Sequence, residues 1–222
     1  MAEIQSTDYH DFVFQEGKLV GEFEQMYRKS AQVPWHQDRD PDRADCRIAI
    51  ELLRIGAPYG TTLELCSGLG YFAQFVQERV PMKSITGSDI SVTAVERSRL
   101  LFPSLSFETL DLCQELAEQG WLGKSFDLVI IRASFWYLFP NMKRVVANLH
   151  TLVKSGGYLF VSQNFPPLDR DFVGKEVIPS PDSLMSHFRG QFTFRAINQF
   201  DDRTTDGGND NWLMFLAQKH AD

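Results

Sequence analysis

Apolar and polar positions alternate between two kinds of segment from about residue 60 onward. Short apolar runs typical of strands are each followed by a longer segment with the apolar spacing of a helix. The expected strands cover 62–66, 83–88, 105–110, 126–132 and 158–163, and the expected helices cover 69–79, 92–102, 113–119 and 142–153. The runs LVII and YLFV are apolar at consecutive positions, as in strands covered on both faces. This repetition predicts a doubly wound, mostly parallel α/β sheet.

The N-terminal part precedes this repetition. Apolar residues of 9–30 lie on a rough helical stripe, although Gly17 and Gly21 weaken or split that helix. A polar, proline-broken connector follows and carries a large aromatic residue, Trp35. A second helix is expected from Pro41, after Asp40 as cap, to about residue 55.

The C-terminal part breaks the repetition. Residues 164–180 are rich in proline and charge, which is more typical of an active-site loop than of a packed element. A short helix is expected over 183–188. The strand-like runs 191–200 and 212–219 are separated by the turn signal Gly207–Gly208, which predicts an antiparallel hairpin.

Composition narrows the function classes. The chain has 222 residues, 22 of them basic and 29 acidic, for a net charge of −7. No cluster of Lys and Arg favours a nucleic acid, no run of apolar residues could span a membrane, and the N-terminus lacks a signal-peptide pattern. Three cysteines stand far apart without metal-site spacing. We expect a cytoplasmic protein that binds a small molecule, without a metal, a membrane or a nucleic acid.

The stretch TTLELCSGLG, residues 61–70, joins an expected strand to an expected helix through glycines. Such a turn exposes backbone N–H groups to a ligand at a helix N-terminus. Asp89 ends the next apolar run about twenty residues after the glycines, where an acid accepts hydrogen bonds from the hydroxyls of a ribose. These features predict a nucleoside-bearing cofactor. Gly68, Gly70 and Ala73 also fit GxGxxA, so a nicotinamide dinucleotide remains an alternative.

Three features favour a different cofactor. Glu64 lies inside the strand end, where a nicotinamide-binding fold would have an apolar residue. Asp111 follows the third expected strand, where an acid could accept a hydrogen bond from the adenine amine. The expected C-terminal hairpin is foreign to simple dinucleotide-binding folds.

The ordered motifs resemble those of a known family. ELCSGLG, residues 64–70, resembles the E/D-x-G-x-G-x-G motif of class I S-adenosylmethionine-dependent methyltransferases. Asp89 matches that family's ribose-binding acid, Asp111 its adenine-side acid, and LVKSGGYLFVSQ its fifth-strand motif. Cys66 stands where the family usually has glycine. The resemblance covers about residues 45–219 and implies a seven-stranded Rossmann-like sheet with S-adenosylmethionine as methyl donor.

The N-terminal segment is similar to that of nodulation-type N-methyltransferases. FEQMYR, residues 23–28, and the pair Pro34–Trp35 carry this likeness, and FDLVIIRASFWYL occupies the place of the group's FDL…YYL. In that group the tryptophan packs over the cofactor. The likeness implies a helical cap over residues 1–58 and a methyltransferase core over 59–222.

The resemblance implies roles for a set of residues. The cofactor would contact Tyr27, Trp35, Glu64, Cys66, Ser67, Gly68, Gly70, Asp89, Ile90, Asp111, Leu112, Ile131 and Arg132. The acceptor would contact Arg39, Phe135, Trp136, Tyr137 and Asn164, with His36 as candidate base. Each assignment has a structural alternative: the acids could be solvated strand ends or helix caps, the aromatic residues could be core, and His36 could be an exposed loop residue.

The sequence thus predicts methyl transfer from S-adenosylmethionine to nitrogen or oxygen of a small molecule, with S-adenosylhomocysteine as product. A nicotinamide-dependent oxidoreductase and a non-catalytic cofactor-binding module are the alternatives, and a macromolecular acceptor is a third. The acceptor, the methylated atom and the oligomeric state are not encoded in any motif.

Overall fold

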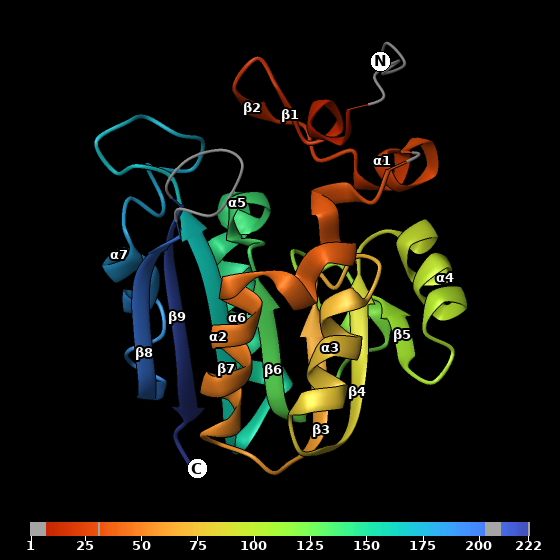
Figure 1. Ribbon diagram of the computed structural model, residues 1–222. Helices are drawn as coiled ribbons and strands as arrows, with labels where there is room; N and C mark the ends of the chain where they lie inside the picture. The colour runs from red at the N-terminus through yellow and green to blue at the C-terminus, as the bar shows by residue number, and fades with distance from the viewer. Residues whose placement is uncertain (1–7, 31, 203–209, 222) are drawn as a thin grey trace.

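Seven strands of the described chain form one sheet in the order β5-β4-β3-β6-β7-β9-β8 (Figure 1). The computed structural model describes residues 8–30, 32–202 and 210–221. The five strands from β5 to β7 are parallel, whereas β9 is antiparallel to both β7 and β8. The strands are β3 (Tyr59–Leu65), β4 (Met82–Asp89), β5 (Ser106–Thr109), β6 (Phe126–Arg132), β7 (Val153–Phe165), β8 (Phe192–Asp202) and β9 (Asp210–Lys219). The predicted doubly wound sheet with an antiparallel end is confirmed.

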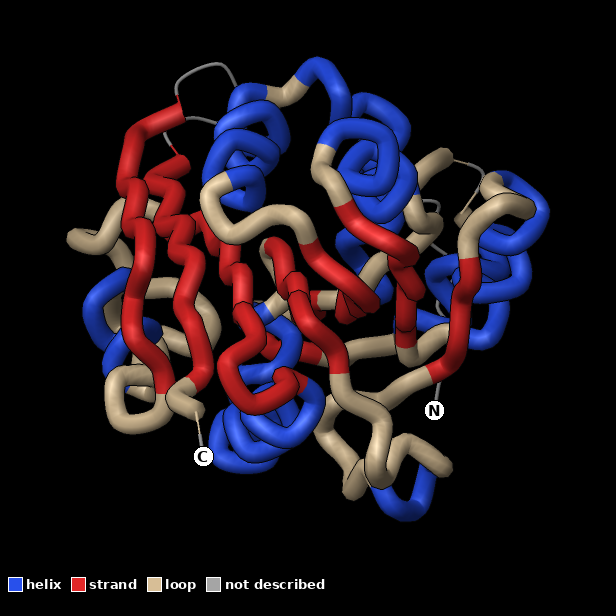
Figure 2. The backbone as a smooth tube through the Cα atoms, turned by 90° about the horizontal axis from the view of Figure 1, so that it is seen from below, coloured by secondary structure: helices blue, strands red, loops and turns tan. Residues whose placement is uncertain are grey.

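Helices cover both faces of the sheet (Figure 2). One apolar core lies between the sheet and α2 (Ala44–Arg54), α3 (Tyr71–Arg79) and α4 (Val92–Leu101). The other lies beneath α5 (Phe135–Leu138), α6 (Met142–Leu152) and α7 (Pro181–Ser186). Short 3₁₀ turns, η3 (Ala117–Gln119) and η4 (Phe139–Asn141), connect these elements. No described helix is both long enough and apolar enough to cross a membrane.

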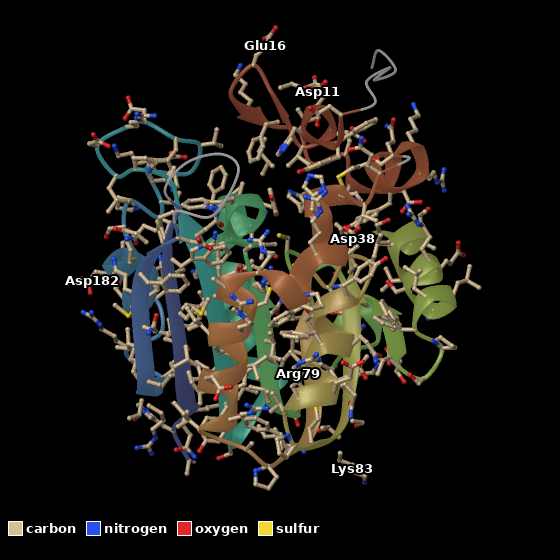
Figure 3. All side chains as sticks on the ribbon, in the orientation of Figure 1. Asp11, Glu16, Asp38, Arg79, Lys83 and Asp182 are labelled. Atoms are coloured by element: carbon tan, nitrogen blue, oxygen red, sulfur yellow. The ribbon has the colours of Figure 1, made fainter. Side chains whose placement is uncertain are left out.

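Residues 8–30 and 32–42 form a separate layer, the N-terminal cover, above the carboxyl ends of the central strands (Figure 1). The cover has an apolar cluster of its own that includes Phe12 and Met26, both fully buried. Asp11 and Glu16 point away from the sheet on its outer side (Figure 3). Its elements are η1 (Tyr9–Phe12), β1 (Phe14–Gln15), β2 (Lys18–Leu19), α1 (Phe23–Lys29) and η2 (Pro34–Asp42).

The predicted secondary structure differs most from the observed one in the N-terminal cover. The helical expectation for 9–30, weakened or split at Gly17 and Gly21, is correct only for 23–29, since β1 pairs with β2 in the preceding part. Glu16 and Gly17 both have positive φ, 49° and 74°, which is the geometry of a two-residue hairpin loop. The second helix begins at Ala44 rather than Pro41, because residues 34–42 form 3₁₀ turns. That helix, α2, packs on the sheet core and not in the cover.

Smaller differences concern the ends of elements. The helix expected over 113–119 is only the 3₁₀ turn η3, and β7 begins at Val153, immediately after α6. β6 and the limits of α4 agree closely with expectation, because a fully apolar run and a Ser91 cap mark them. Residues 166–180 contain neither helix nor strand, as expected. The expected turn at Gly207–Gly208 lies outside the described residues.

Candidate cofactor and acceptor site

A cavity of about 440 Å³ lies at the carboxyl ends of the central parallel strands, under the N-terminal cover. The chain runs outward from β3 to β4 and β5, and then returns to the other side of β3 as β6. Open α/β sheets bind ligands at such a switch point, where the loops after adjacent strands diverge. The cavity is therefore the natural place for a ligand in this fold.

The glycine turn after β3 forms one wall of the cavity, and Asp89 fixes its shape. The backbone N–H of Gly68 donates to Asp89 Oδ2 at 2.9 Å, and the N–H of Ser91 donates to Asp89 Oδ1 at 3.0 Å. Burial raises the pKa of Asp89 to about 6, although hydrogen bonds from Ser91, Gly68 and Ile90 offset part of that effect. Hydrogen bonds to two backbone N–H groups thus hold the carboxyl group in place at the cavity that it lines.

Gly68 offers a direct test of this wall. Its φ is +55°, and an added Cβ would collide with the amide of Gln37 and the hydroxyl of Tyr27. We expect Gly68→Ala to lose about 1–2 kcal/mol of stability through the left-handed backbone and to weaken S-adenosylhomocysteine binding at least tenfold, as measured by calorimetry.

Gly120→Ala is the matched control for that substitution. Gly120 also has positive φ, +73°, but an added Cβ there meets nothing within 4 Å. It should lose no more stability than Gly68→Ala, since only the left-handed backbone is affected, and should bind S-adenosylhomocysteine normally. Equal binding by the two variants would contradict a ligand site at the glycine turn.

The turn after β5 forms the opposite wall. Asp111 Oδ1 accepts from the backbone N–H of Cys113 at 2.8 Å, so the carboxylate closes a local turn as well as lining the cavity. Apolar side chains of Ile90 and Leu112 also line the cavity, and Ile90 is 48% exposed. These residues combine apolar surface with one carboxylate, which suits a base with a polar edge.

A third part of the wall holds two guanidinium groups on one buried carboxylate. Asp45 is fully buried, and its oxygens accept from Arg43 Nε at 2.9 Å and from Arg132 Nη2 at 3.2 Å. Burial opposes ionisation of Asp45, but the charges of Arg132 and Arg43 outweigh it and hold the pKa of that carboxyl below its ordinary value. Arg43 and Arg132 both line the cavity, so this cluster presents one net positive charge to a ligand.

Aromatic side chains of the cover close the cavity from above. Trp35 is the centre of this group, with ring centroids 5.6 Å from Tyr9, 5.7 Å from Tyr137 and 6.4 Å from Tyr27. Burial raises the pKa of Tyr27 and that of Tyr137, so both phenols stay neutral at ordinary pH. Gln37 hydrogen-bonds with Tyr27 and accepts from the N–H of Leu69 at 2.9 Å, which ties this group to the glycine turn.

Backbone strain also gathers at the cavity. Among described residues other than glycine, five have positive φ, and four of these line the cavity: Trp35, His36, Cys66 and Ala133. Such conformations cost free energy and persist where the surroundings impose them, most often at functional sites. Cys66 thus adopts a conformation that favours glycine, the residue usual at this place in the resembling family. Burial raises the pKa of its thiol, which remains protonated.

Most of the residues expected from the sequence line this cavity. The cofactor candidates that do so are Tyr27, Trp35, Glu64, Cys66, Ser67, Asp89, Ile90, Asp111, Leu112 and Arg132, and the acceptor candidates are His36, Trp136, Tyr137 and Asn164. Gly68 and Gly70 do not line the cavity themselves, but a Cβ at Gly68 would meet two side chains that do, those of Gln37 and Tyr27. Ile131 and Phe135 are fully buried in the core beneath it, and Arg39 is exposed outside it.

Other lining residues were not expected from the sequence. They include Tyr9, His10, Phe14, Phe23, Gln37, Arg43, Phe72 and Trp212. Phe72 falls within the GxGxxA turn and could have been inferred from it. Trp212 comes from β9, and only the pairing of β9 with β7 brings it beside Asn164.

The fold and the cavity define the class of protein first. A mostly parallel sheet with an acid beside a glycine turn at its switch point is typical of α/β proteins that bind nucleoside cofactors. Residues 63–159 also match the family model described as a methyltransferase domain. Residues 63–159 of this chain are therefore similar to a methyltransferase domain, and the sheet has the Rossmann-like fold of the solved structures that it resembles.

Solved structures with the same fold include an N-methyltransferase. NodS from Bradyrhizobium japonicum WM9, in complex with S-adenosylhomocysteine, is 17% identical with a TM-score of 0.70, over 88% of this chain and 97% of that one. The [4+2]-cyclase SpnF is 15% identical with a TM-score of 0.65, over 85% of this chain and 84% of that one. At these identities the likeness concerns the fold alone.

Curated relatives are much longer proteins. The hybrid synthetase pydA from Acremonium sp is 29% identical over 112 residues, which are 48% of this chain and 3% of that protein. The lovastatin nonaketide synthase mokA from Monascus pilosus is 30% identical over 105 residues, 45% of this chain and 3% of that protein. This chain therefore matches only a small part of each of them.

Proposed function

We propose that the chain transfers a methyl group from S-adenosylmethionine to a nitrogen or oxygen atom of a small-molecule acceptor. The observation that carries this proposal is the placement of Glu64, Asp89 and Asp111 at the ends of three adjacent parallel strands, around one cavity. These acids can serve the amino group, the ribose and the adenine of one cofactor. The parts of a dinucleotide would not require an acid at Glu64.

The residues present fit that cofactor. Ser67 Oγ is buried beside the glycine turn and has no hydrogen-bond partner among the described residues. A ligand amino or carboxyl group would supply one. In this proposal Glu64 and the turn from Cys66 to Gly70 hold the methionine amino group, and the guanidinium groups of Arg43 and Arg132 attract its carboxylate.

The nucleoside half would lie against the carboxyl ends of β4 and β5. Asp89 would accept hydrogen bonds from the two ribose hydroxyls, and Asp111 would accept one from the adenine amine. Ile90 and Leu112 would contact the faces of the base. In support, all four residues line the same cavity.

The bound cofactor supplies a methyl group on a sulfonium, which passes to the acceptor in an in-line displacement. Alignment accounts for most of the acceleration of such a reaction. The acceptor would lie under the cover among Tyr9, Tyr137, Trp136 and Asn164, where aromatic side chains exclude water. His36, which is exposed at the rim, is the proposed base for acceptors that carry a proton.

A melting experiment separates this proposal from a nicotinamide-dependent oxidoreductase. At a hundredfold excess over its Kd, S-adenosylhomocysteine should stabilise the fold by about 2.7 kcal/mol and raise Tm by roughly 5–10 °C, whereas NAD should leave Tm unchanged. The reverse result would favour the oxidoreductase.

A turnover assay distinguishes an enzyme from a non-catalytic binding module. The test is worthwhile because SpnF, a [4+2]-cyclase with the same fold, shows that this fold also hosts other functions. Methyl transfer from labelled S-adenosylmethionine in a screen of amines, phenols and carboxylic acids is the expected result. Binding without transfer to any acceptor, proteins and RNA included, would support a non-catalytic module.

A further inference from the structure

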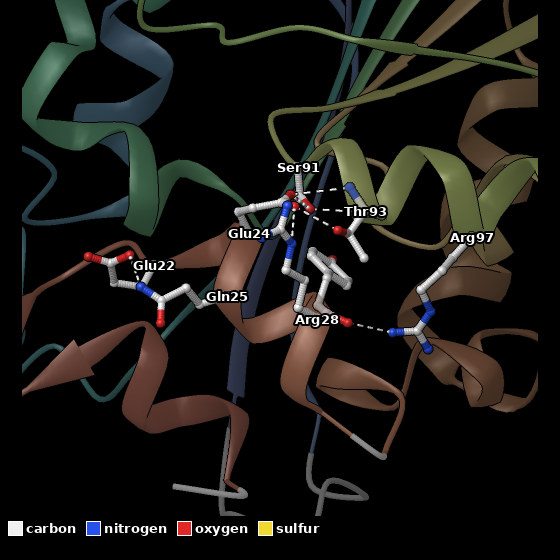
Figure 4. Close-up of polar contacts among 9 residues, drawn as sticks. Glu22, Glu24, Gln25, Arg28, Ser91, Thr93 and Arg97 are labelled. Atoms are coloured by element: carbon white, nitrogen blue, oxygen red, sulfur yellow. Dashed lines mark hydrogen bonds and ion pairs between the residues drawn. The ribbon is translucent and has the colours of Figure 1, made fainter. Parts of the chain in front are cut away.

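One carboxylate of the N-terminal cover is bonded directly to the part of the chain that carries the ribose-binding acid (Figure 4). Glu24, in α1, accepts from Ser91 Oγ at 2.6 Å and from the backbone N–H of Thr93 at 3.2 Å. Its other oxygen accepts from Thr93 Oγ1 at 2.6 Å. These residues are 67 and 69 positions away in sequence, so the contact joins two distant segments.

The contact is made at the N-terminus of α4, which immediately follows the Asp89 turn. Ser91 is the N-cap of α4: its hydroxyl accepts from the N–H of Ala94, and its own N–H donates to Asp89. A carboxylate at a helix N-terminus is stabilised by the exposed N–H groups there. Partial burial opposes ionisation of Glu24, yet hydrogen bonds from Ser91 and Thr93 lower its pKa to about 2. Glu24 therefore makes this contact as an ionised carboxylate at any ordinary pH.

The same helix delivers a side chain to the cavity. Tyr27 lies three residues after Glu24, is 3% exposed and lines the cavity. A second bond, from Arg97 Nη1 to the carbonyl oxygen of Tyr27 at 2.9 Å, holds the end of α1 on α4 (Figure 4). Glu24 itself does not line the cavity, so any effect it has on a ligand must pass through α1 or through the Asp89 turn.

We propose that Glu24 is a positioning residue that couples closure of the N-terminal cover to occupation of the ribose site. Its carboxylate holds α1 against the start of α4, which places Tyr27 over the cavity while Ser91 keeps Asp89 oriented. Ligand bound at Asp89 and the closed cover then stabilise each other. This inference rests on the proposed cofactor site.

Hydrogen exchange and calorimetry with S-adenosylhomocysteine as probe test this coupling. In the wild type, the ligand should protect amides of both 23–42 and 89–95. In Glu24→Ala, it should still protect 89–95 but lose its protection of 23–42, with binding weakened about tenfold and dissociation correspondingly faster. Glu24→Gln keeps the shape and one acceptor oxygen, and should give a smaller loss.

Glu22→Ala is the matched control. Glu22 precedes the same helix, but its carboxylate accepts from Gln25 within its own segment, at 3.1 Å. It should bind the probe as the wild type does. Equal affinities of Glu24→Ala and Glu22→Ala, or unchanged protection of 23–42 in Glu24→Ala, would overturn the proposal. If Glu24→Ala does not fold, Glu24→Gln decides between the same outcomes. Failure of the wild type itself to bind the probe would overturn the cofactor site first.

Discussion

Asp89→Ala is expected to abolish measurable binding of S-adenosylhomocysteine, which the wild type is expected to bind. The carboxylate would accept hydrogen bonds from two ribose hydroxyls, and bonds to a charged acceptor contribute about 1.5–3 kcal/mol each. Losing both corresponds to a decrease in affinity of more than about a hundredfold. Isothermal calorimetry of Asp89→Ala measures this decrease. Circular dichroism must show that the variant is folded, because Asp89 also accepts from the backbone of Gly68 and Ser91.

The pH dependence of S-adenosylhomocysteine binding tests whether the Asp89 carboxylate is the group that binds the ribose. Since the pKa of Asp89 in the free protein is about 6, the carboxyl is ionised above pH 7 and mostly protonated at pH 5. Only the ionised form accepts bonds from both hydroxyls, so affinity should be constant above pH 7 and fall about tenfold per unit below 6. Asp89→Asn should bind weakly and without this dependence. A wild type whose affinity is flat from pH 5 to 8 would contradict the assignment.

The same pKa has a cost for folding. The native value of about 6 lies above the unfolded value of 3.8, so the native state binds more protons between those two pH values. Asp89 therefore contributes most to stability below pH 4, and this contribution is lost as pH rises through 6. Perturbed pKa values of this kind cluster at functional sites, which favours the proposed role of Asp89 in ligand binding.

The parts of the fold that the sequence predicted correctly are those set by local pattern. β6 is apolar at every central position and α4 begins at a Ser91 cap, so neither depends on distant contacts. In the cover, the apolar stripe of 9–30 suggested a helix weakened or split at Gly17 and Gly21, but the chain forms a hairpin there, with positive φ at Glu16 and Gly17. Side-chain periodicity does not report such backbone conformations.

The site divides in the same way. Asp89 and the glycine turn are close in sequence to the strand ends that present them, so their spacing alone was sufficient to propose them as site residues. Asp45 and Arg132 are 87 positions apart, and Arg43 precedes a helix whose start was misplaced. This buried charge cluster forms only when α2 packs against the sheet and brings distant segments together, and no sequence motif predicts that packing.

The cluster of Asp45, Arg43 and Arg132 is the basis of a second prediction, which concerns the stability of the fold. Asp45→Ala is expected to lower the free energy of unfolding by about 3–5 kcal/mol. It leaves the nearly buried guanidinium group of Arg132 and the partly exposed one of Arg43 without their shared carboxylate. Arg132 is 13% exposed and Asp45 fully buried, so water compensates little. Urea denaturation measures the change. Ligand affinity is the second measurement. Without Asp45 the guanidinium groups of Arg43 and Arg132 are no longer held in place, so binding of S-adenosylhomocysteine should weaken. Binding of 5′-methylthioadenosine, which lacks the amino-acid end, should not change.

Asp182→Ala is the matched control for exposure, since Asp182 also pairs with an arginine, Arg189, at 2.5 Å, but 72% of its side chain is exposed. Exposed pairs contribute at most about 1 kcal/mol, so this variant should remain close to the wild type in stability and in ligand binding. If Asp45→Ala lost no more stability than Asp182→Ala, the cluster would not be a buried one. If it lost affinity for both ligands equally, Arg43 and Arg132 would not be the groups that attract the methionine carboxylate, and that charge would have to be met elsewhere in the cavity.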